Sequence, residues 1–406
     1  MGRIEPSGGA ADLRDHGRLA VLNAIRLAGR IARIDISRAV GLSPATVTAI
    51  TAEMIAAGVL EEIRQEEKPS QSRRGRPRVL LKLRGGAHRV AGVKVAQRYI
   101  SVLILDFEGR EIIRHQMSLA RAKMQSVELV DQVTLAVEQA CGKGGFRPDD
   151  LSGIGIGLAG QIDAIRNFVH WSSSLIHRNA DLASVLAQRL PVPAFLDNDA
   201  NLVAKAEHLF GAVRNVNNFL VVTIEHGVGL GIILDGELYR GARGCGAELG
   251  HTKVQYEGAL CQCGQRGCLE AYVGGYAMLR EANVEIAGSN IQGDISDFLA
   301  AAQAGNQTAL SVLERAGRIL AMGIANLINV FDPELIILAG ARVSFRHFYE
   351  RNVMPEMQRM VVQVDAPLPE IRVHEWGDEM WAKGAAAYAI EQVSVLTVRE
   401  LAKDAV

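Results

Sequence analysis

The most informative stretch of this chain begins at Glu248-Leu249-Gly250-His251 and continues with Cys261-Gln262-Cys263-Gly264-Gln265-Arg266-Gly267-Cys268-Leu269-Glu270. Three cysteines and a histidine supply four ligands of the type that zinc prefers in a closed tetrahedral site. The glycines between the cysteines suit the tight turns of a metal knuckle. We therefore predict a zinc ion bound by His251, Cys261, Cys263 and Cys268. A chance cluster of buried thiols is the alternative, and a disulfide is a weaker one.

Polar residues beside these ligands predict a second site. A closed zinc site leaves no open position for a substrate, so Glu248 and Glu270 should serve something beside the metal. Upstream, residues 195–201 predict a strand that ends in a polar turn and opens a helix. Asn198 and Asp199 in that turn offer an amide and a carboxylate, which suit vicinal hydroxyls. Together these residues predict a carbohydrate pocket, although Asp199 could merely cap the helix.

Length and composition are those of an ordinary soluble protein. The chain has 406 residues, 49% of them hydrophobic, which is enough for two or three domains. No basic segment followed by an apolar run opens the sequence, and no run of about 18 apolar residues occurs. Five cysteines, three of them in the knuckle, fit a reducing compartment. We therefore expect a cytoplasmic protein.

The charges divide the chain into a basic head and an acidic body. Residues 1–84 carry 15 Lys and Arg against 9 Asp and Glu, a net charge of +6, whereas the remaining residues carry 29 against 36, a net charge of −7. This asymmetry predicts different partners for the two parts. We predict a DNA-binding domain over residues 1–84, a first α/β lobe over 85–197 completed by a helix at about 382–400, and a second lobe over 198–381.

The basic head has the pattern of a helix-turn-helix domain. Apolar spacing predicts helices over residues 18–28 and 34–40. Ser43-Pro44 is a strong start signal for a third helix that ends near residue 57 and buries Val47, Ile50 and Met54. A plain helical hairpin is the alternative. The side chains of the third helix that are small or polar enough to approach bases are Ser43, Ala45, Thr46, Thr48 and Ala49.

A wing is predicted after the third helix. Residues 59–63 and 79–83 can form a two-stranded β-ribbon, and the loop between them contains Arg73, Arg74 and Arg76. Arginines on such a loop can contact phosphates or enter a minor groove. A charge run is often only a solvated surface, but its position beside a helix-turn-helix favours a winged helix that binds double-stranded operator DNA.

The acidic body shows an α/β pattern that occurs twice. Each copy has three consecutive strands, the second and third joined by a hairpin turn, followed by a helix and a further strand. Such a repeat predicts two similar lobes with a ligand cleft. The three-strand sets are predicted at residues 90–95, 100–106 and 111–118, and at 219–224, 229–234 and 237–239.

At these motifs the chain resembles the ROK family, whose name joins repressors, open reading frames and sugar kinases. The resemblance covers nearly the whole length and includes the winged helix, the two lobes, the turn at 197–201, the segment 241–251 and the knuckle at 261–270. It implies an α/β fold, with an N-terminal winged helix followed by a duplicated, two-lobe, actin-like or ribonuclease H-like sugar-kinase fold. It also implies that the zinc is structural and holds His251 toward a sugar. The sugar-binding residues that it implies are Asn198, Asp199 (the position of the kinases' catalytic base), Glu248, His251 and Glu270.

The chain departs from the kinases of this family at three places. The first-lobe hairpin Asp-x-Gly-Gly-Thr, which approaches ATP phosphates, is replaced by residues 94–98, Lys-Val-Ala-Gln-Arg. The second-lobe Gly-Thr-Gly becomes Glu225-His226-Gly227, whose carboxylate should repel ATP, and a later Gly-Gly pair becomes Gly340-Ala341. We therefore expect sugar binding without phosphorylation. Ser174 replaces an asparagine often found near the sugar, so the identity of the sugar stays open.

The sequence thus predicts a sugar-responsive transcriptional regulator. The preferred interpretation is a repressor of genes for carbohydrate uptake or catabolism. We expect a homo-oligomer, a dimer or tetramer, because paired winged helices can bind a pseudo-palindromic operator. Two alternatives stay open. One is an active ATP-dependent sugar kinase with a DNA-binding head, and the other is a regulator whose signal is a second protein that docks on the zinc lobe.

Overall fold

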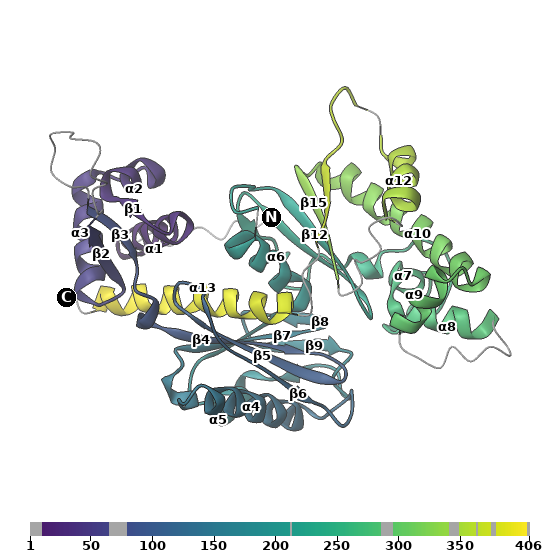
Figure 1. Ribbon diagram of the computed structural model, residues 1–406, viewed down its shortest axis with the longest axis horizontal. Helices are drawn as coiled ribbons and strands as arrows, with labels where there is room; N and C mark the ends of the chain where they lie inside the picture. The colour runs from purple at the N-terminus through teal and green to yellow at the C-terminus, as the bar shows by residue number, and fades with distance from the viewer. Residues whose placement is uncertain are drawn as a thin grey trace. The chain divides into compact units, whose positions relative to one another are not determined.

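The computed structural model describes residues 10–64, 79–211, 213–285, 295–340, 349–362, 364–374 and 379–403. The chain forms two compact units (Figure 1). Unit 1 comprises Met1–Leu158, Ser173–Leu196 and Ala385–Val406. Unit 2 comprises Ala159–Ser172 and Asp197–Gly384.

Three helices begin unit 1, and the start of the third is the one that the sequence predicts. The Ser43 hydroxyl oxygen accepts a hydrogen bond from the Thr46 backbone N–H at 3.1 Å, and Pro44 occupies the first helical turn. Arg18 of the first helix donates two hydrogen bonds to Glu53 of the third and so fixes their packing. The helices are α1 Ala10–Ala28, α2 Arg33–Val40 and α3 Pro44–Ala56.

The β-ribbon of the head has one strand more than the sequence predicts. Strands β2 (Leu60–Arg64) and β3 (Val79–Leu83) pair antiparallel, as expected, and β1 (Ile31–Ala32) adds to the other edge of β3. A strand of two residues carries no periodic signal, so the predicted two-stranded ribbon was incomplete. The predicted wing arginines Arg73, Arg74 and Arg76 lie outside the described residues.

The head is joined to the rest of unit 1 by a buried arginine of α1. Arg26 donates hydrogen bonds to the Phe107 carbonyl at 2.7 Å and to the Ser394 hydroxyl at 3.0 Å, and its guanidinium lies over the Phe107 ring. Burial lowers the pKa of Arg26 to about 10, opposed by the nearby Glu391 carboxylate. The head therefore contacts both the turn between β5 (Tyr99–Asp106) and β6 (Glu111–Ser118) and the C-terminal helix α13 (Glu379–Lys403).

The main sheet of unit 1 has the strand order β11-β7-β4-β5-β6. Helices α4 and α5 lie along one face and α13 along the other (Figure 1). Gly155 on β7 permits the close approach of α13, because a Cβ there would lie 1.9 Å from the Ala385 carbonyl oxygen. The elements are β4 Arg89–Val95, β5 Tyr99–Asp106, β6 Glu111–Ser118, α4 Ser126–Lys143, β7 Gly153–Leu158, α5 Ala183–Arg189 and β11 Ala194–Asn198.

The sheet of unit 2 has the order β14-β13-β12-β15-β16 and separates two apolar cores. Alternate residues of β12 serve opposite faces, as a strand requires. Leu220 and Val222 pack in a core with α10, whereas Phe219 and Val221 pack against α6. The elements are α6 Asp199–Phe210, β12 Phe219–Ile224, β13 Val228–Leu234, β14 Glu237–Leu238, α10 Gln307–Phe331, β15 Leu335–Ala339 and β16 Glu370–Val373.

The two sheets have the same topology, so the predicted duplication is confirmed. In unit 1, β4 pairs antiparallel with β5 and parallel with β7; in unit 2, β12 pairs antiparallel with β13 and parallel with β15. When the five strands of each sheet are numbered by their order along the chain, both sheets have the spatial order third, second, first, fourth, fifth.

Unit 2 also contains two further strands and four further helices among the described residues. They are β8 Gly160–Asp163 and β9 Phe168–Ser172, and α7 Glu270–Val273, α8 Gly275–Glu285, α9 Ile295–Gln303 and α12 Met354–Met360.

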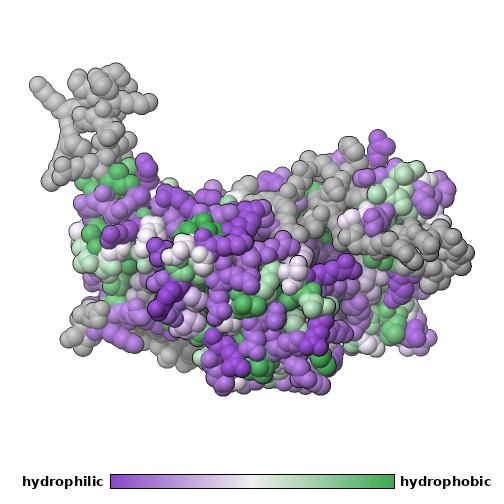
Figure 2. Space-filling view, turned by 60° about the horizontal axis from the view of Figure 1, so that its bottom comes forward, coloured by the Kyte–Doolittle hydropathy of each residue, from purple (hydrophilic) through white to green (hydrophobic). Residues whose placement is uncertain are grey.

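The surface shown in Figure 2 is mainly hydrophilic, with hydrophobic side chains in small scattered patches. Among the described residues, no single helix is long and apolar enough to cross a membrane. The pair α2 and α3 passes the same test of length and composition only when taken together, and it is bent by 115°.

Candidate functional site

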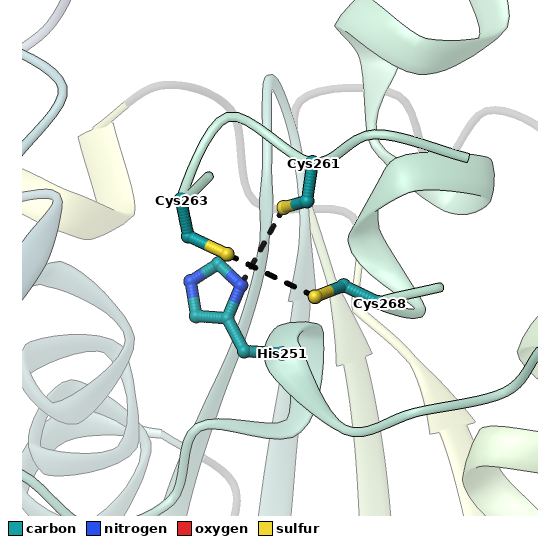
Figure 3. A group of neighbouring side chains, drawn as sticks. All are labelled: His251, Cys261, Cys263 and Cys268. Carbon is teal, nitrogen blue, oxygen red and sulfur yellow. Dashed lines mark hydrogen bonds between the residues drawn. The ribbon is translucent and has the colours of Figure 1, made fainter. Parts of the chain in front are cut away.

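The four predicted metal ligands lie together in unit 2. His251 ends the short 3-10 helix Leu249–His251, and the three cysteines occupy the loop before α7. The Cys261 sulfur lies 3.7 Å from His251 Nδ1, and the Cys263 and Cys268 sulfurs lie 3.8 Å apart. All four side chains point toward one another (Figure 3), with the four candidate ligand atoms within 4.8 Å of one another. The cluster can hold a metal ion.

Glycines make the cysteine loop tight enough for this convergence. Gly264 and Gly267 adopt φ angles of +92° and +75°, a region that side chains rarely enter. A Cβ at Gly267 would also lie 1.7 Å from the Gln255 carbonyl oxygen. The Cys261 backbone N–H donates to the Gln265 carbonyl at 2.8 Å and closes the turn that contains Gly264. The convergence of the three cysteines therefore depends on glycine at these two positions.

Two glutamates adjoin the cluster from both sides. Glu248 Oε2 lies 3.8 Å from His251 Nε2, the ring nitrogen that does not face Cys261. Glu270 is buried and accepts a hydrogen bond from the Val228 backbone N–H at 3.1 Å. Burial raises the pKa of each carboxyl to about 7, while the nearby His251 opposes both increases. Near neutral pH these groups can both donate and accept, which suits hydroxyl ligands.

The side-chain amide of Asn198 makes hydrogen bonds to the protein backbone that the sequence does not predict. Its Oδ1 accepts from the Ala200 and Asn201 backbone N–H groups, which makes Asn198 the N-cap of α6. Its Nδ2 donates to the Gly160 carbonyl at 2.7 Å. The capping role therefore falls chiefly on Asn198, although Asp199 Oδ1 also accepts from Ala200 N–H. Burial is the main cause of the raised pKa of Glu248, and the Glu270 and Asp199 carboxylates add to it.

A buried ion pair that no sequence pattern predicts fixes this turn. Asp197 is 0% exposed and accepts hydrogen bonds from Arg240 at 2.5 and 3.1 Å. It also accepts from the Asn198 backbone N–H at 2.7 Å and from Asn201 Nδ2 at 3.0 Å. Arg240 follows β14 and leads into the loop that reaches Glu248. The pair thus ties the Asn198 turn to that loop, and no local pattern identifies which of the many arginines would do so.

Two glycines of β13 bring α6 against the sheet. A Cβ at Gly229 would lie 2.7 Å from the Ala200 Cβ, and one at Gly231 would lie 2.6 Å from the Ala200 carbonyl oxygen. Neither glycine needs a positive φ angle. In this chain the two glycines allow α6 to pack closely on β13. The start of α6 therefore lies beside β13, whose first residue, Val228, donates its backbone N–H to Glu270.

The segment Glu225-His226-Gly227, which the sequence predicts to differ from the kinase hairpin, contacts the same site. The Glu225 backbone N–H donates to the Gly227 carbonyl at 2.9 Å, and a Cβ at Gly227 would lie 2.4 Å from Glu270 Oε2. The His226 ring lies 3.2 Å from the Gln262 side chain of the cysteine loop. In unit 1, Lys94 is buried near the end of β4. Ala341 and Arg342 lie outside the described residues.

The predicted DNA-contacting residues of α3 are on its outer face. Val47, Ile50 and Met54 are buried, as predicted. The Thr48 hydroxyl donates to the Pro44 carbonyl at 2.7 Å. The side chains predicted to approach bases are exposed, namely Ser43, Ala45, Thr46, Thr48 and Ala49.

Comparison with known proteins identifies the family. The family model described as ROK matches residues 90–392, and the model described as winged helix-turn-helix DNA-binding matches residues 14–61. The chain belongs to the ROK family. This assignment confirms the predicted fold class and the N-terminal winged helix.

Named regulators of the ROK family are similar over most of the chain. A xylose repressor of Caldicellulosiruptor bescii is 31% identical over 346 residues, which are 82% of this chain and 84% of that protein. The DNA-binding transcriptional dual regulator NagC of Escherichia coli is 29% identical over 79% of each chain.

Solved ROK structures include regulators and kinases. A ROK transcriptional regulator described as a homolog of the E. coli MLC protein has a TM-score of 0.81 at 26% identity and covers 96% of this chain and 99% of its own. A ROK glucokinase from Streptomyces griseus, solved with glucose and AMPPNP, has a TM-score of 0.64 at 27% identity and covers 74% of this chain and 99% of its own. Of these two, the regulator superimposes on more of the chain.

Proposed function

We propose that this protein is a transcriptional repressor that binds operator DNA through its winged helix and responds to a sugar bound in unit 2. The observation that carries the proposal is the presence, in one ROK chain, of a winged helix with an exposed, small and polar α3 face. The similarity to proteins named xylose repressor and NagC supports it. We place the protein in the cytoplasm as a homo-oligomer, a dimer or tetramer, because paired heads fit a two-fold operator.

The proposed sugar site consists of side chains that can exchange hydrogen bonds with hydroxyl groups. Glu248 and Glu270, with pKa values raised to about 7, and the Asp199 carboxylate support it. Asn198 would contribute its second amide hydrogen. The sugar can shift the protein between states only by binding one of them more tightly. The residues proposed to bind it are Asn198, Asp199, Glu248, His251 and Glu270.

We also propose that the His/Cys cluster binds zinc. Its donor set is the Cys3His set of structural zinc sites. In a tetrahedron with Zn–S bonds of about 2.3 Å, two sulfurs lie about 3.8 Å apart, which is close to the 3.8 Å between Cys263 and Cys268. The metal would hold His251 through Nδ1 and leave Nε2 toward Glu248. Its role would be structural.

We also propose domain boundaries after residues 84 and 197, which separate the DNA-binding domain, the first α/β lobe and the second α/β lobe.

Operator selection tests the main proposal. Genomic DNA fragments are selected with the full-length protein, and anisotropy then measures their dissociation constant at fixed salt, with and without common hexoses, pentoses and amino sugars. We expect sequence-specific binding that one sugar class weakens. Binding that is equal on all fragments would remove the repressor assignment. Specific binding that no sugar changes would leave a DNA-binding protein whose signal is another molecule.

The Ala49→Glu variant should lose operator affinity. A carboxylate on the outer face of α3 would face phosphates and base edges, so we expect a loss of about 10- to 100-fold, equivalent to about 1–3 kcal/mol. Ala56→Glu is the matched control, because Ala56 is also exposed but lies in the last turn of α3, away from the end that enters the groove. Equal losses in both variants would show that α3 is not the recognition helix.

We expect no sugar-dependent ADP release from ATP. Glu225 replaces a glycine in the second-lobe hairpin of the kinases, and a carboxylate there opposes an incoming triphosphate. A coupled ADP assay over the same sugars checks this, and a ROK glucokinase serves as the positive control. Turnover above the enzyme-free rate would support the sugar kinase alternative, which the structural similarity to a ROK glucokinase keeps in view.

A further inference from the structure

Lys253 is an exposed residue beside the cysteine cluster and is not one of its candidate ligands. Residues Lys253 and Cys268 form an isolated antiparallel β-bridge, so their side chains emerge side by side. Lys253 Nζ lies 2.9 Å from the Cys268 sulfur, 3.2 Å from the His251 carbonyl oxygen and 2.6 Å from Gln265 Oε1. A lysine ammonium has three donors. All three are directed at the cluster or at its loop.

The charge of the proposed metal site explains why a cation would be useful there. Three thiolates, one neutral imidazole and Zn²⁺ give the site a net charge of −1, which a lysine ammonium neutralises. Cys268 is 0% exposed, so water cannot solvate its sulfur. A buried charge needs a partner, and a charge-assisted hydrogen bond is stronger than a neutral one.

The sulfur contacts differ among the three cysteines. Cys261, which is 3% exposed, receives a hydrogen bond from the Tyr276 hydroxyl at 3.6 Å. Cys268 receives its hydrogen bond from the Lys253 ammonium. Cys263 is only partly buried. Each of the two buried sulfurs therefore accepts a hydrogen bond from a residue that is not a candidate metal ligand. The donor to Cys261 is a neutral hydroxyl, whereas the donor to Cys268 is a charged ammonium.

We propose that Lys253 is a positioning residue of the zinc site, which neutralises the Cys268 thiolate and ties it to the His251 backbone. The inference rests on the proposed zinc. Partners that hydrogen-bond to metal ligands typically contribute about 10- to 100-fold to metal affinity. Gln265 assists by accepting one ammonium hydrogen from within the loop.

The test measures zinc affinity directly, with zinc ion as the probe. Full-length wild type, Lys253→Met and Lys253→Arg are titrated against a chromophoric chelator at pH 7. Lys253→Met keeps the apolar stem and removes the charge, so we expect an affinity about 10- to 100-fold below wild type. Lys253→Arg should recover part of the loss. Arg266→Met is the matched control, because Arg266 lies in the same loop and donates to the Gly258 carbonyl at 3.3 Å.

Each outcome decides the role of Lys253. Equal zinc affinity in wild type and Lys253→Met would overturn it while leaving the zinc assignment in place. An equal loss in Arg266→Met would also overturn it, because the effect would then be one of total charge. A wild-type chain that binds no zinc would overturn both proposals. Circular dichroism in excess zinc establishes that Lys253→Met is folded, and Lys253→Arg supplies the comparison if it is not.

Discussion

Replacing Arg240 with alanine should destabilise unit 2 by about 3–5 kcal/mol, since removal of one partner of a buried ion pair leaves the other charge uncompensated. Asp197 is 0% exposed and would keep only neutral donors, the Asn198 backbone N–H and the Asn201 amide. Because the pair ties the Asn198 turn to the loop that reaches Glu248, sugar affinity should fall as well. Denaturant unfolding and calorimetric titration with the sugar found by operator selection measure the two effects.

Two further variants separate the charge effect from simple loss of a side chain. Arg243→Ala is the matched control, because Arg243 is exposed in the same loop, and it should change stability by less than about 0.5 kcal/mol. The double variant Asp197→Asn with Arg240→Ala should be more stable than Arg240→Ala alone, because the buried charge is gone. If Arg240→Ala behaved like Arg243→Ala, the pair would not be what positions the turn.

Replacing Cys263 with serine should remove zinc from the protein and abolish the sugar response, while the winged helix keeps its affinity for operator DNA. Serine is a poor zinc ligand, and the remaining three ligands would bind the ion far more weakly. Without the metal, the His251 ring loses the contact that fixes its orientation toward Glu248. We expect sugar affinity to fall by at least about 10-fold. Zinc content by atomic absorption, sugar titration and operator anisotropy check the three parts.

Cys245→Ser is the control for this substitution. Cys245 is a partly exposed cysteine of the same unit and lies outside the four-ligand cluster. It should retain zinc and the sugar response. A Cys263→Ser protein that lacks zinc but still releases DNA on addition of sugar would separate metal binding from sensing. In that case the cluster would stabilise the loop only.

Much of the fold follows from local sequence signals. The Ser43-Pro44 start of α3 is correct because capping is decided within one turn of helix. The strand sets of both units were predicted because alternation and hairpin glycines are short-range signals, and their repetition revealed the duplication. Strand β1 was missed because two residues are too few to show a period.

The sequence alone also indicated the four candidate metal ligands, because cysteine, histidine and glycine at this spacing have few other uses together. What only the tertiary structure decided is how the surrounding residues are held. Asp197 meets Arg240 across 43 positions of sequence, and Lys253 meets Cys268 through a β-bridge. Which charged side chain compensates a buried charge depends on three-dimensional proximity. Sequence spacing does not encode it, because a long flexible side chain can pair with any acceptor that the fold brings near.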